Sequence, residues 1–262
     1  MFLKIGSLSA LAAVALLAEV GMPRLGEIRQ ADGVIVPFFG LASNSIAGKP
    51  LPYKNVLSGS FSDEAGLLLM PDRIVLLDAN ELEIASYPSS DANAIVSVSE
   101  GLTSAVVWLP SQTSLLHWNG HRFESTELDR SLIPGKVLDL VSAGGNNIRL
   151  LLQEATGRSE YSLEGGQLRH LRYLPAGNGP ALLIGSAVLI QGGTQLQLVK
   201  KNGDVNTIPL TSAAVRFEKA SRNAVHILSI SGERHWILEL GTSGPLLSEL
   251  PRIPNNPGEV IH

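Results

Sequence analysis

The feature that most constrains this chain is a tight turn that returns at nearly regular intervals. Counting from Asn80, the turn residues Gly120, Gly166, Gly203 and Gly244 follow at intervals of 40, 46, 37 and 41 residues. Between the turns lie short runs rich in Leu, Val and Ile. Runs of this length, bounded by Gly, Asn and Asp, indicate strands, and a period near forty residues indicates a repeated unit of several strands.

Five such units can be cut from the sequence, at residues 54–91, 92–134, 135–176, 177–212 and 213–252. Each holds about four strand-length segments. In the second unit, residues 104–109 are mostly apolar, whereas residues 122–128 alternate with charge. A strand covered on both faces reads as a continuous apolar run, and one with a wet face alternates. Pro209, in the last segment of the fourth unit, is tolerated only at a sheet edge.

These patterns predict an all-β fold of the β-propeller type, with about five four-stranded blades, or six. The Leu-rich stretches are too short for helices and are bounded by turn residues. Two β-sandwiches or an open solenoid of sheets are alternatives, but neither explains the forty-residue period as simply.

The segments outside the repeats divide the rest of the chain. Residues 22–53 do not match the repeat but contain one apolar run at 34–39. This run either completes the last blade beside residues 246–247 or belongs to a degenerate sixth blade, and both arrangements would cover an exposed sheet edge. Residues 54–252 form the repeats. Residues 253–262 lack apolar periodicity, and we expect a mobile tail there.

The first 21 residues have the pattern of a secretory signal peptide. Lys4 precedes an apolar stretch from Ile5 to Leu17, and small residues follow as cleavage sites. About thirteen apolar residues are fewer than the roughly 20 that span a bilayer, so we expect no stable membrane insertion after cleavage. The expected location is periplasmic or secreted.

Composition excludes several kinds of chemistry. Charged residues make up 17% of the chain and the formal net charge is -4, so the clustered Lys and Arg that bind nucleic acid are missing. The chain has no cysteine, which removes disulfides and thiolate chemistry. It also lacks a nucleophile elbow, a phosphate-binding loop, a zinc helix and a calcium loop. We therefore predict no cofactor and no metal.

The repeat units resemble those of bacterial secreted β-propellers of the broad WD40-like and NHL-like kind. The resemblance covers residues 54–252 and rests on the period and the strand pattern. No unit ends in Trp-Asp or carries a Tyr-Val-Thr-Asn segment. The resemblance therefore implies the fold, and it assigns neither a named subfamily nor ligand residues.

The candidates for catalysis are carboxylates in the connections that should share one face of the ring. Glycosidases need a carboxyl pair at a defined separation, and acidic residues around a central funnel would supply it. The simpler interpretation is that these are solvated acidic side chains in loops. The connections are also poor in the aromatic residues that bind sugars, and only Trp108 could serve as a sugar platform. The weak candidates are Asp72, Asp91, Asp129, Glu154 and Glu233.

The histidines and the other tryptophans have structural interpretations. His117 and His121 flank a turn and lack the helical spacing of a shared metal site, and a hairpin that brings them together is the minor alternative. His226 and His235 fall in neighbouring predicted strands, where cross-strand pairing can occur, and we expect a hydrogen-bonded structural histidine rather than a metal ligand or catalytic base. His170 lies on an outer strand, and Trp118 and Trp236 occupy core positions.

Taken together, the sequence predicts an exported module without catalytic activity that presents rigid loops to a protein, peptide or glycan. Affinity would come from a few buried groups rather than from net charge. A glycoside hydrolase that uses the carboxylates named above is the alternative from another functional class. A purely structural repeat protein is the third.

Overall fold

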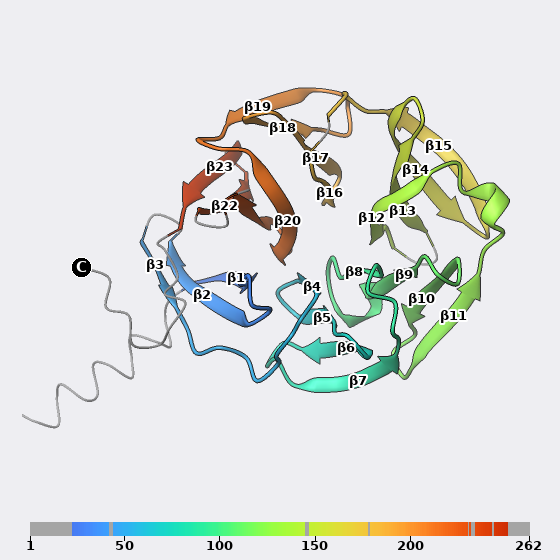
Figure 1. Cartoon of the computed structure of the whole chain (residues 1–262), viewed down its shortest axis with the longest axis horizontal. Helices are drawn as coiled ribbons and strands as arrows, with labels where there is room; N and C mark the ends of the chain where they lie inside the picture. The colour runs from blue at the N-terminus through green and yellow to red at the C-terminus, as the bar shows by residue number, and fades with distance from the viewer. Residues whose placement is uncertain are drawn as a thin grey trace, which may run out of the picture.

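The computed structural model describes residues 23–41, 44–144, 147–177, 179–229, 231, 234–242 and 244–250. These residues form 23 strands and two 3-10 helices, η1 (Leu102–Ser104) and η2 (Arg130–Leu132). The sheets surround a common centre as the blades of a propeller do (Figure 1). The prediction of an all-β, propeller-like fold with about five four-stranded units is confirmed. The predicted signal peptide at 1–21 and the predicted tail at 253–262 lie outside the described residues.

Five consecutive units of four strands make up most of the ring. The first unit contains β4 (Ser58–Phe61), β5 (Ala65–Leu69), β6 (Arg73–Asp78) and β7 (Glu83–Pro88). The second contains β8 (Ile95–Ser97), β9 (Val106–Leu109), β10 (Ser114–Trp118) and β11 (Phe123–Glu127). The third contains β12 (Lys136–Ser142), β13 (Ile148–Glu154), β14 (Gly157–Glu164) and β15 (Gln167–Tyr173). The fourth contains β16 (Ala181–Ile184), β17 (Ala187–Gly192), β18 (Gln195–Val199) and β19 (Val205–Pro209). The fifth contains β20 (Ala214–Ser221), β21 (Ala224–Ser229), β22 (His235–Gly241) and β23 (Gly244–Glu249).

Within each unit every strand pairs antiparallel with the next strand along the chain, and the first strand faces the centre (Figure 1). Three units are separate four-stranded sheets. The first and fifth units join into one eight-stranded sheet, because their inner strands β4 and β20 make a short parallel contact at Ser60 and Lys219.

A three-stranded sheet lies between the fifth unit and the first (Figure 1). It consists of β1 (Arg24–Arg29), β2 (Ile35–Leu41) and β3 (Asn44–Ala47). The apolar run at residues 34–39 therefore pairs with β1 and β3 in a sheet of its own and does not extend the last unit. The sequence pattern predicts this apolar run but neither β1 nor β3.

The three-stranded sheet packs closely against β20. A Cβ atom on Gly26 of β1 would lie 2.1 Å from the carbonyl oxygen of Ala220, and Gly26 has a φ of 134°. Both the space and the backbone conformation therefore require glycine at this position. On one face of the sheet Ile28 and Phe38 pack with Ala220 and Ile237 of the fifth unit. On the other face, Ile35 packs against apolar residues of the first unit.

Apolar side chains fill the spaces between neighbouring units. Leu151 of β13, for example, is fully buried and packs with Leu183, Val188 and Ile190 of the fourth unit. Burial decreases from the centre outward: β5 is buried along its whole length, whereas β7 and β15 are largely exposed. Pro209 lies on the edge strand β19, where its missing N–H breaks no pairing within the sheet.

Candidate binding site

A cavity of about 850 Å³ opens at one end of the ring. Its walls come from the turns that connect the first and second strands of the second, third, fourth and fifth units, and from the turn between β10 and β11. Buried residues of the inner strands line it as well, including Lys219, Val141 and Leu183. The volume is within the range of pockets that hold small molecules or short peptide segments.

The carboxylates predicted from sequence belong to the opposite end of the ring. Because strand direction alternates, turns between second and third strands, and links between units, lie at the end away from turns between first and second strands. Asp72 follows β5 and Glu154 ends β13, while Asp91 and Asp129 lie in links between units. None of these four lines the cavity. The fifth candidate, Glu233, lies outside the described residues.

Three of the four described candidates hold local structure in place. Asp91 accepts hydrogen bonds from the backbone N–H groups of Asn93 and Ser111, and Asp129 caps η2 by accepting from Ser131. Partial burial acts to raise the pKa of Asp91, but the hydrogen bonds from Ser111 and Asn93 together outweigh it and lower the pKa. The hydrogen bond from Ser131 lowers the pKa of Asp129. Hydrogen bonds of this kind favour the charged form of a carboxyl group, and here they stabilise the turns that contain Asp91 and Asp129.

Glu154 accepts a hydrogen bond of 2.8 Å from the hydroxyl of Tyr161. Burial and this bond raise the pKa of Tyr161 to about 12. Asp72 is exposed, and its backbone carbonyl accepts from the N–H of Ser89. The four carboxylates therefore lie in separate surroundings, and the cavity does not bring them together.

A buried lysine crosses the centre of the ring beside the cavity. Lys219 Nζ donates to Ser97 Oγ at 2.7 Å and to the carbonyl of Leu140 at 3.2 Å, and lies 3.5 Å from Asp139 Oδ2. The same carboxylate oxygen accepts from the N–H of Leu183 at 2.7 Å. These contacts connect the inner strands β8, β12, β16 and β20. The ammonium group is thus satisfied within the protein.

Burial acts on both members of this pair. It raises the pKa of Asp139 and lowers the pKa of Lys219, while the charge of each partner acts in the opposite direction. Neither residue was singled out from the sequence. The available signal was a charged side chain inside an otherwise apolar inner strand, Asp139 in β12 and Lys219 in β20, since buried charges require partners.

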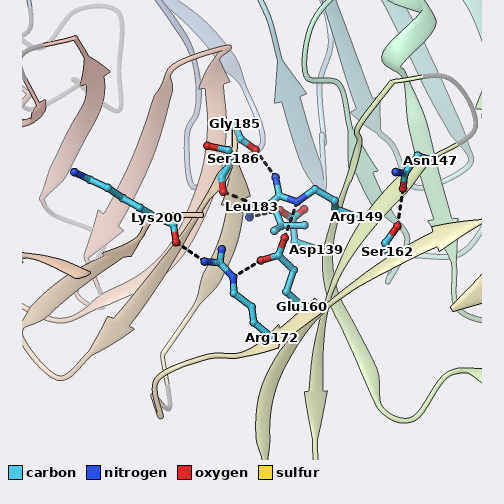
Figure 2. A network of polar contacts seen from close by, with 10 residues as sticks. All are labelled: Asp139, Asn147, Arg149, Glu160, Ser162, Arg172, Leu183, Gly185, Ser186 and Lys200. Carbon is cyan, nitrogen blue, oxygen red and sulfur yellow. Dashed lines mark hydrogen bonds and ion pairs between the residues drawn. The ribbon is translucent and has the colours of Figure 1, made fainter. Parts of the chain in front are cut away.

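A second ionic cluster supports the cavity wall at the boundary of the third and fourth units. Figure 2 shows Glu160 between the side chains of Arg149 and Arg172. Arg149 Nε donates to Glu160 at 2.6 Å and Arg172 Nε at 2.7 Å, one to each carboxylate oxygen. The arginines also donate to carbonyl groups of the fourth unit, Arg149 to Gly185 and Ser186, and Arg172 to Lys200. Arg149 lines the cavity, and each of its three guanidinium nitrogens already donates one hydrogen bond within the protein.

The groups that remain free in the cavity are mostly uncharged. In the described part of the chain, six polar side chains in the wall have no hydrogen-bond partner: Thr103, His117, Ser142, Ser186, Ser221 and Asn223. At the exposed rim, Arg222 forms an ion pair of 2.9 Å with Glu100. Among the residues described, Glu100 is the carboxylate that lines the cavity. The site therefore offers hydroxyl and amide groups that can both donate and accept, with its charges matched.

Aromatic side chains offer little stacking surface in the cavity. Trp118 lines it but is 6% exposed and packs edge-on against Phe123, with ring centroids 5.3 Å apart. The suggestion that Trp108 serves as a sugar platform is wrong, because its side chain is buried between the second and third units. Trp118 and Trp236 are buried, as expected for core residues.

Two of the histidines considered as structural residues, His226 and His235, form a buried pair away from the cavity. His226 Nε2 lies 2.9 Å from His235 Nδ1, with the rings stacked. Burial, followed by the nearby charges of His235, Arg216 and Arg29, lowers the pKa of His226 well below its usual value. His170 is on the outer strand β15, and His121 is exposed in its turn.

Across the residues that the structure describes, no group of three or more His, Asp, Glu or Cys side chains could hold a metal ion. Over the same residues, no helix is long and apolar enough to cross a membrane.

No family model matches this chain, and neither does any curated protein. Solved structures with similar folds include Hsv2 from Kluyveromyces lactis, with 11% sequence identity and a TM-score of 0.47 over 74% of this chain and 62% of that one. Streptogramin B lyase shares 15% identity, with a TM-score of 0.46 over 79% of this chain and 72% of the lyase. PorZ, a bacterial surface component of the type-IX secretion system of Porphyromonas gingivalis, shares 12% identity, with a TM-score of 0.48 over 91% of this chain and 39% of PorZ. This chain thus spans less than two thirds of Hsv2 and of PorZ. The likenesses carry no functional argument, and the propeller-like fold is assigned from the sheet arrangement of the chain itself.

Proposed function

We propose that this chain is an exported, non-catalytic binding module whose central cavity holds a segment of a partner protein. The observation that carries the proposal is the cavity of about 850 Å³ walled by turns from four units. Turns held by packed sheets keep a fixed shape, so little conformational entropy is lost when a ligand binds. Export is proposed from the signal-peptide pattern in residues 1–21.

The chemistry of the cavity favours a polypeptide over other ligand classes. Its buried charges, Lys219 and Arg149, are matched by Asp139 and Glu160, so a charged ligand gains no unpaired buried partner. Hydroxyl and amide groups are free to pair with the N–H and C=O groups of a bound main chain. A glycan would gain little from Trp118, whose ring is almost fully covered.

The glycoside-hydrolase alternative requires two carboxyl groups facing each other across one site. Among the described residues only Glu100 supplies a carboxylate to the cavity wall, and it is paired with Arg222. The local hydrogen bonds of Asp91, Asp129 and Glu154 give these residues structural roles at the other end. The geometry therefore supports binding better than hydrolysis.

Site-specific photo-cross-linking tests the proposal. A photoreactive amino acid placed at Ser221, in the cavity wall, is expected to capture one partner from the periplasmic or culture-medium proteins of the native host. The matched control carries the probe at Asp72, at the opposite end of the ring. A second substitution, Ser186→Trp, should fill the cavity from an exposed turn and abolish the adduct at Ser221 without lowering the melting temperature. A strong adduct at Asp72, or an adduct at Ser221 that Ser186→Trp leaves unchanged, would contradict the proposal.

A further inference from the structure

The outermost strands of the five units and of the three-stranded sheet differ in how well they are protected against pairing with another chain. An unpaired edge strand exposes a row of N–H and C=O groups, and proteins block such edges with proline, short strands or charge. β7, β19 and β23 contain Pro88, Pro209 and Pro245 respectively. β3 has only four residues, and β11 has five with acidic side chains at Glu124 and Glu127.

β15 has neither the proline, the short length nor the acidic side chains of the other edges, and its charged residues, Arg169 and Arg172, are cationic. It is seven residues long, with the sequence Gln-Leu-Arg-His-Leu-Arg-Tyr. Over the described parts of the chain, β14 is its one paired neighbour. Leu171 is the extra residue of a bulge in this pairing and is 39% exposed, and Tyr173 is 76% exposed. β15 is therefore a long edge with exposed apolar side chains.

The charge around β15 is positive although the whole chain is acidic. Arg169 is exposed and has no ion-pair partner in the described part of the chain. The turn of the fourth unit that carries Lys200 and Lys201 lies beside β15, because the Arg172 side chain donates to the Lys200 carbonyl (Figure 2). The nearby acidic residues are Glu164, in the hairpin before β15, and Asp204, which accepts from Asn202. Arg172 itself is neutralised by Glu160.

We propose that β15 is a docking edge for an extended acidic segment of a partner protein, which adds as a further strand. Main-chain hydrogen bonds supply affinity in this mode of recognition, and side chains supply specificity. A second copy of this chain fits less well, because pairing two β15 strands brings Arg169 and the neighbouring Lys200 and Lys201 toward the same cations of the other copy. The site is separate from the central cavity and does not depend on what the cavity holds.

The test uses the full chain and two synthetic peptides of seven residues, one alternating Val with Glu and the other alternating Val with Lys. Binding is followed by amide hydrogen exchange of each edge strand. We expect the Glu peptide to slow exchange in β15 and not in β11, and the Lys peptide to have no effect there. Arg169→Glu should weaken the Glu peptide about tenfold, as loss of an attraction and gain of a repulsion at one site imply. The control, Arg122→Glu, makes the same change in net charge at an exposed residue beside β11 and should leave binding unchanged.

Three results would overturn the proposal: no protection of β15 by the Glu peptide, equal protection by both peptides, or equal weakening by Arg169→Glu and Arg122→Glu. Protection of β15 that grows with protein concentration in the absence of peptide would show self-pairing instead. Circular dichroism melting of both variants confirms that the fold is intact. The cavity cross-link at Ser221 should survive Arg169→Glu, so failure here is distinguishable from failure of the proposed function.

Discussion

Glu160 and Glu218 each lie between two arginines at a boundary between sheets, but the two carboxylates are bonded differently. Glu160 receives one charge-assisted hydrogen bond on each oxygen, at 2.6 and 2.7 Å. At Glu218, Oε1 accepts from Arg29 at 2.7 Å, while Oε2 lies 3.3 Å from Arg216 without a hydrogen bond. Burial raises the pKa of Glu218 against the lowering effect of both arginines.

A buried ion pair stabilises where hydrogen bonds satisfy the atoms that burial removes from water, and Glu160 meets this condition on both oxygens whereas Glu218 meets it on one. Around Glu160 the arginines also bond carbonyl groups of the next unit, so the cluster joins two units. Around Glu218, Arg216 Nε lacks a hydrogen bond, and burial lowers the pKa of Arg216. We expect the first cluster to contribute more to stability than the second.

The largest expected effect is that of Glu160→Ala. The substitution removes two charge-assisted hydrogen bonds and leaves the largely buried guanidinium groups of Arg149 and Arg172 without a counter-charge. Breaking a buried pair in this way costs about 3–5 kcal/mol. The urea midpoint of unfolding measures the loss. A change below about 1 kcal/mol would show that the two arginines move into solvent at no cost.

A pH experiment concerns another carboxylate in the three-stranded sheet. Glu27 of β1 is buried and forms an ion pair with Arg24, yet burial raises its pKa from 4.5 to about 7. The folded state binds this proton more tightly than the unfolded state, so protonation of Glu27 stabilises the folded protein. This stabilisation, up to about 3 kcal/mol, is fully present below pH 4.5 and is lost as the pH rises through 7.

Glu27→Gln removes this titration while Arg24 keeps its ion pair with Glu81. The variant should therefore gain stability relative to the unmodified chain between pH 4.5 and pH 7.5, so that the difference in the free energy of unfolding, variant minus unmodified chain, increases with pH. Urea denaturation at four pH values in this interval measures the difference. A flat or opposite difference would show that Glu27 is ionised in the folded protein throughout, and that its ion pair offsets its burial.

The two clusters also show how much of the molecule could be predicted from the sequence. Arg149, Glu160 and Arg172 belong to successive strands of one unit, and the turn at Gly165 and Gly166 fixes the neighbouring register, so local patterns place them in one sheet. Arg29 and Glu218 are 189 residues apart. Their contact depends on where the non-repeating N-terminal strands pack, which the periodicity does not specify.

The cavity was missed for a similar reason. Its walls use Ser, Thr and Asn side chains in turns that look like ordinary hairpins, together with charges that are matched by other units. Carboxylates such as Asp72 and Asp91 are candidates in the sequence because acidic residues in loops can be catalytic. The pairing of Lys219 with Asp139 requires the positions of several inner strands around the centre, and these follow only from the closed ring.

The smallest effect is expected for Glu218→Gln. Measuring it together with the separate variant Glu160→Gln tests the comparison of the two clusters most directly. Glutamine resembles the protonated carboxyl group, which the raised pKa of Glu218 indicates is well tolerated, and its oxygen can still accept from Arg29. We expect Glu218→Gln to cost about 1 kcal/mol or less, because the lost attraction is largely offset by easier burial. Glu160→Gln replaces an oxygen that accepts at 2.6 or 2.7 Å by an NH₂ group facing an arginine, so it should cost about 2 kcal/mol. Urea midpoints of the two variants at pH 7 give the order, and a larger loss for Glu218→Gln would mean that the ion pairs of Arg29 and Arg216 hold the three-stranded sheet in place.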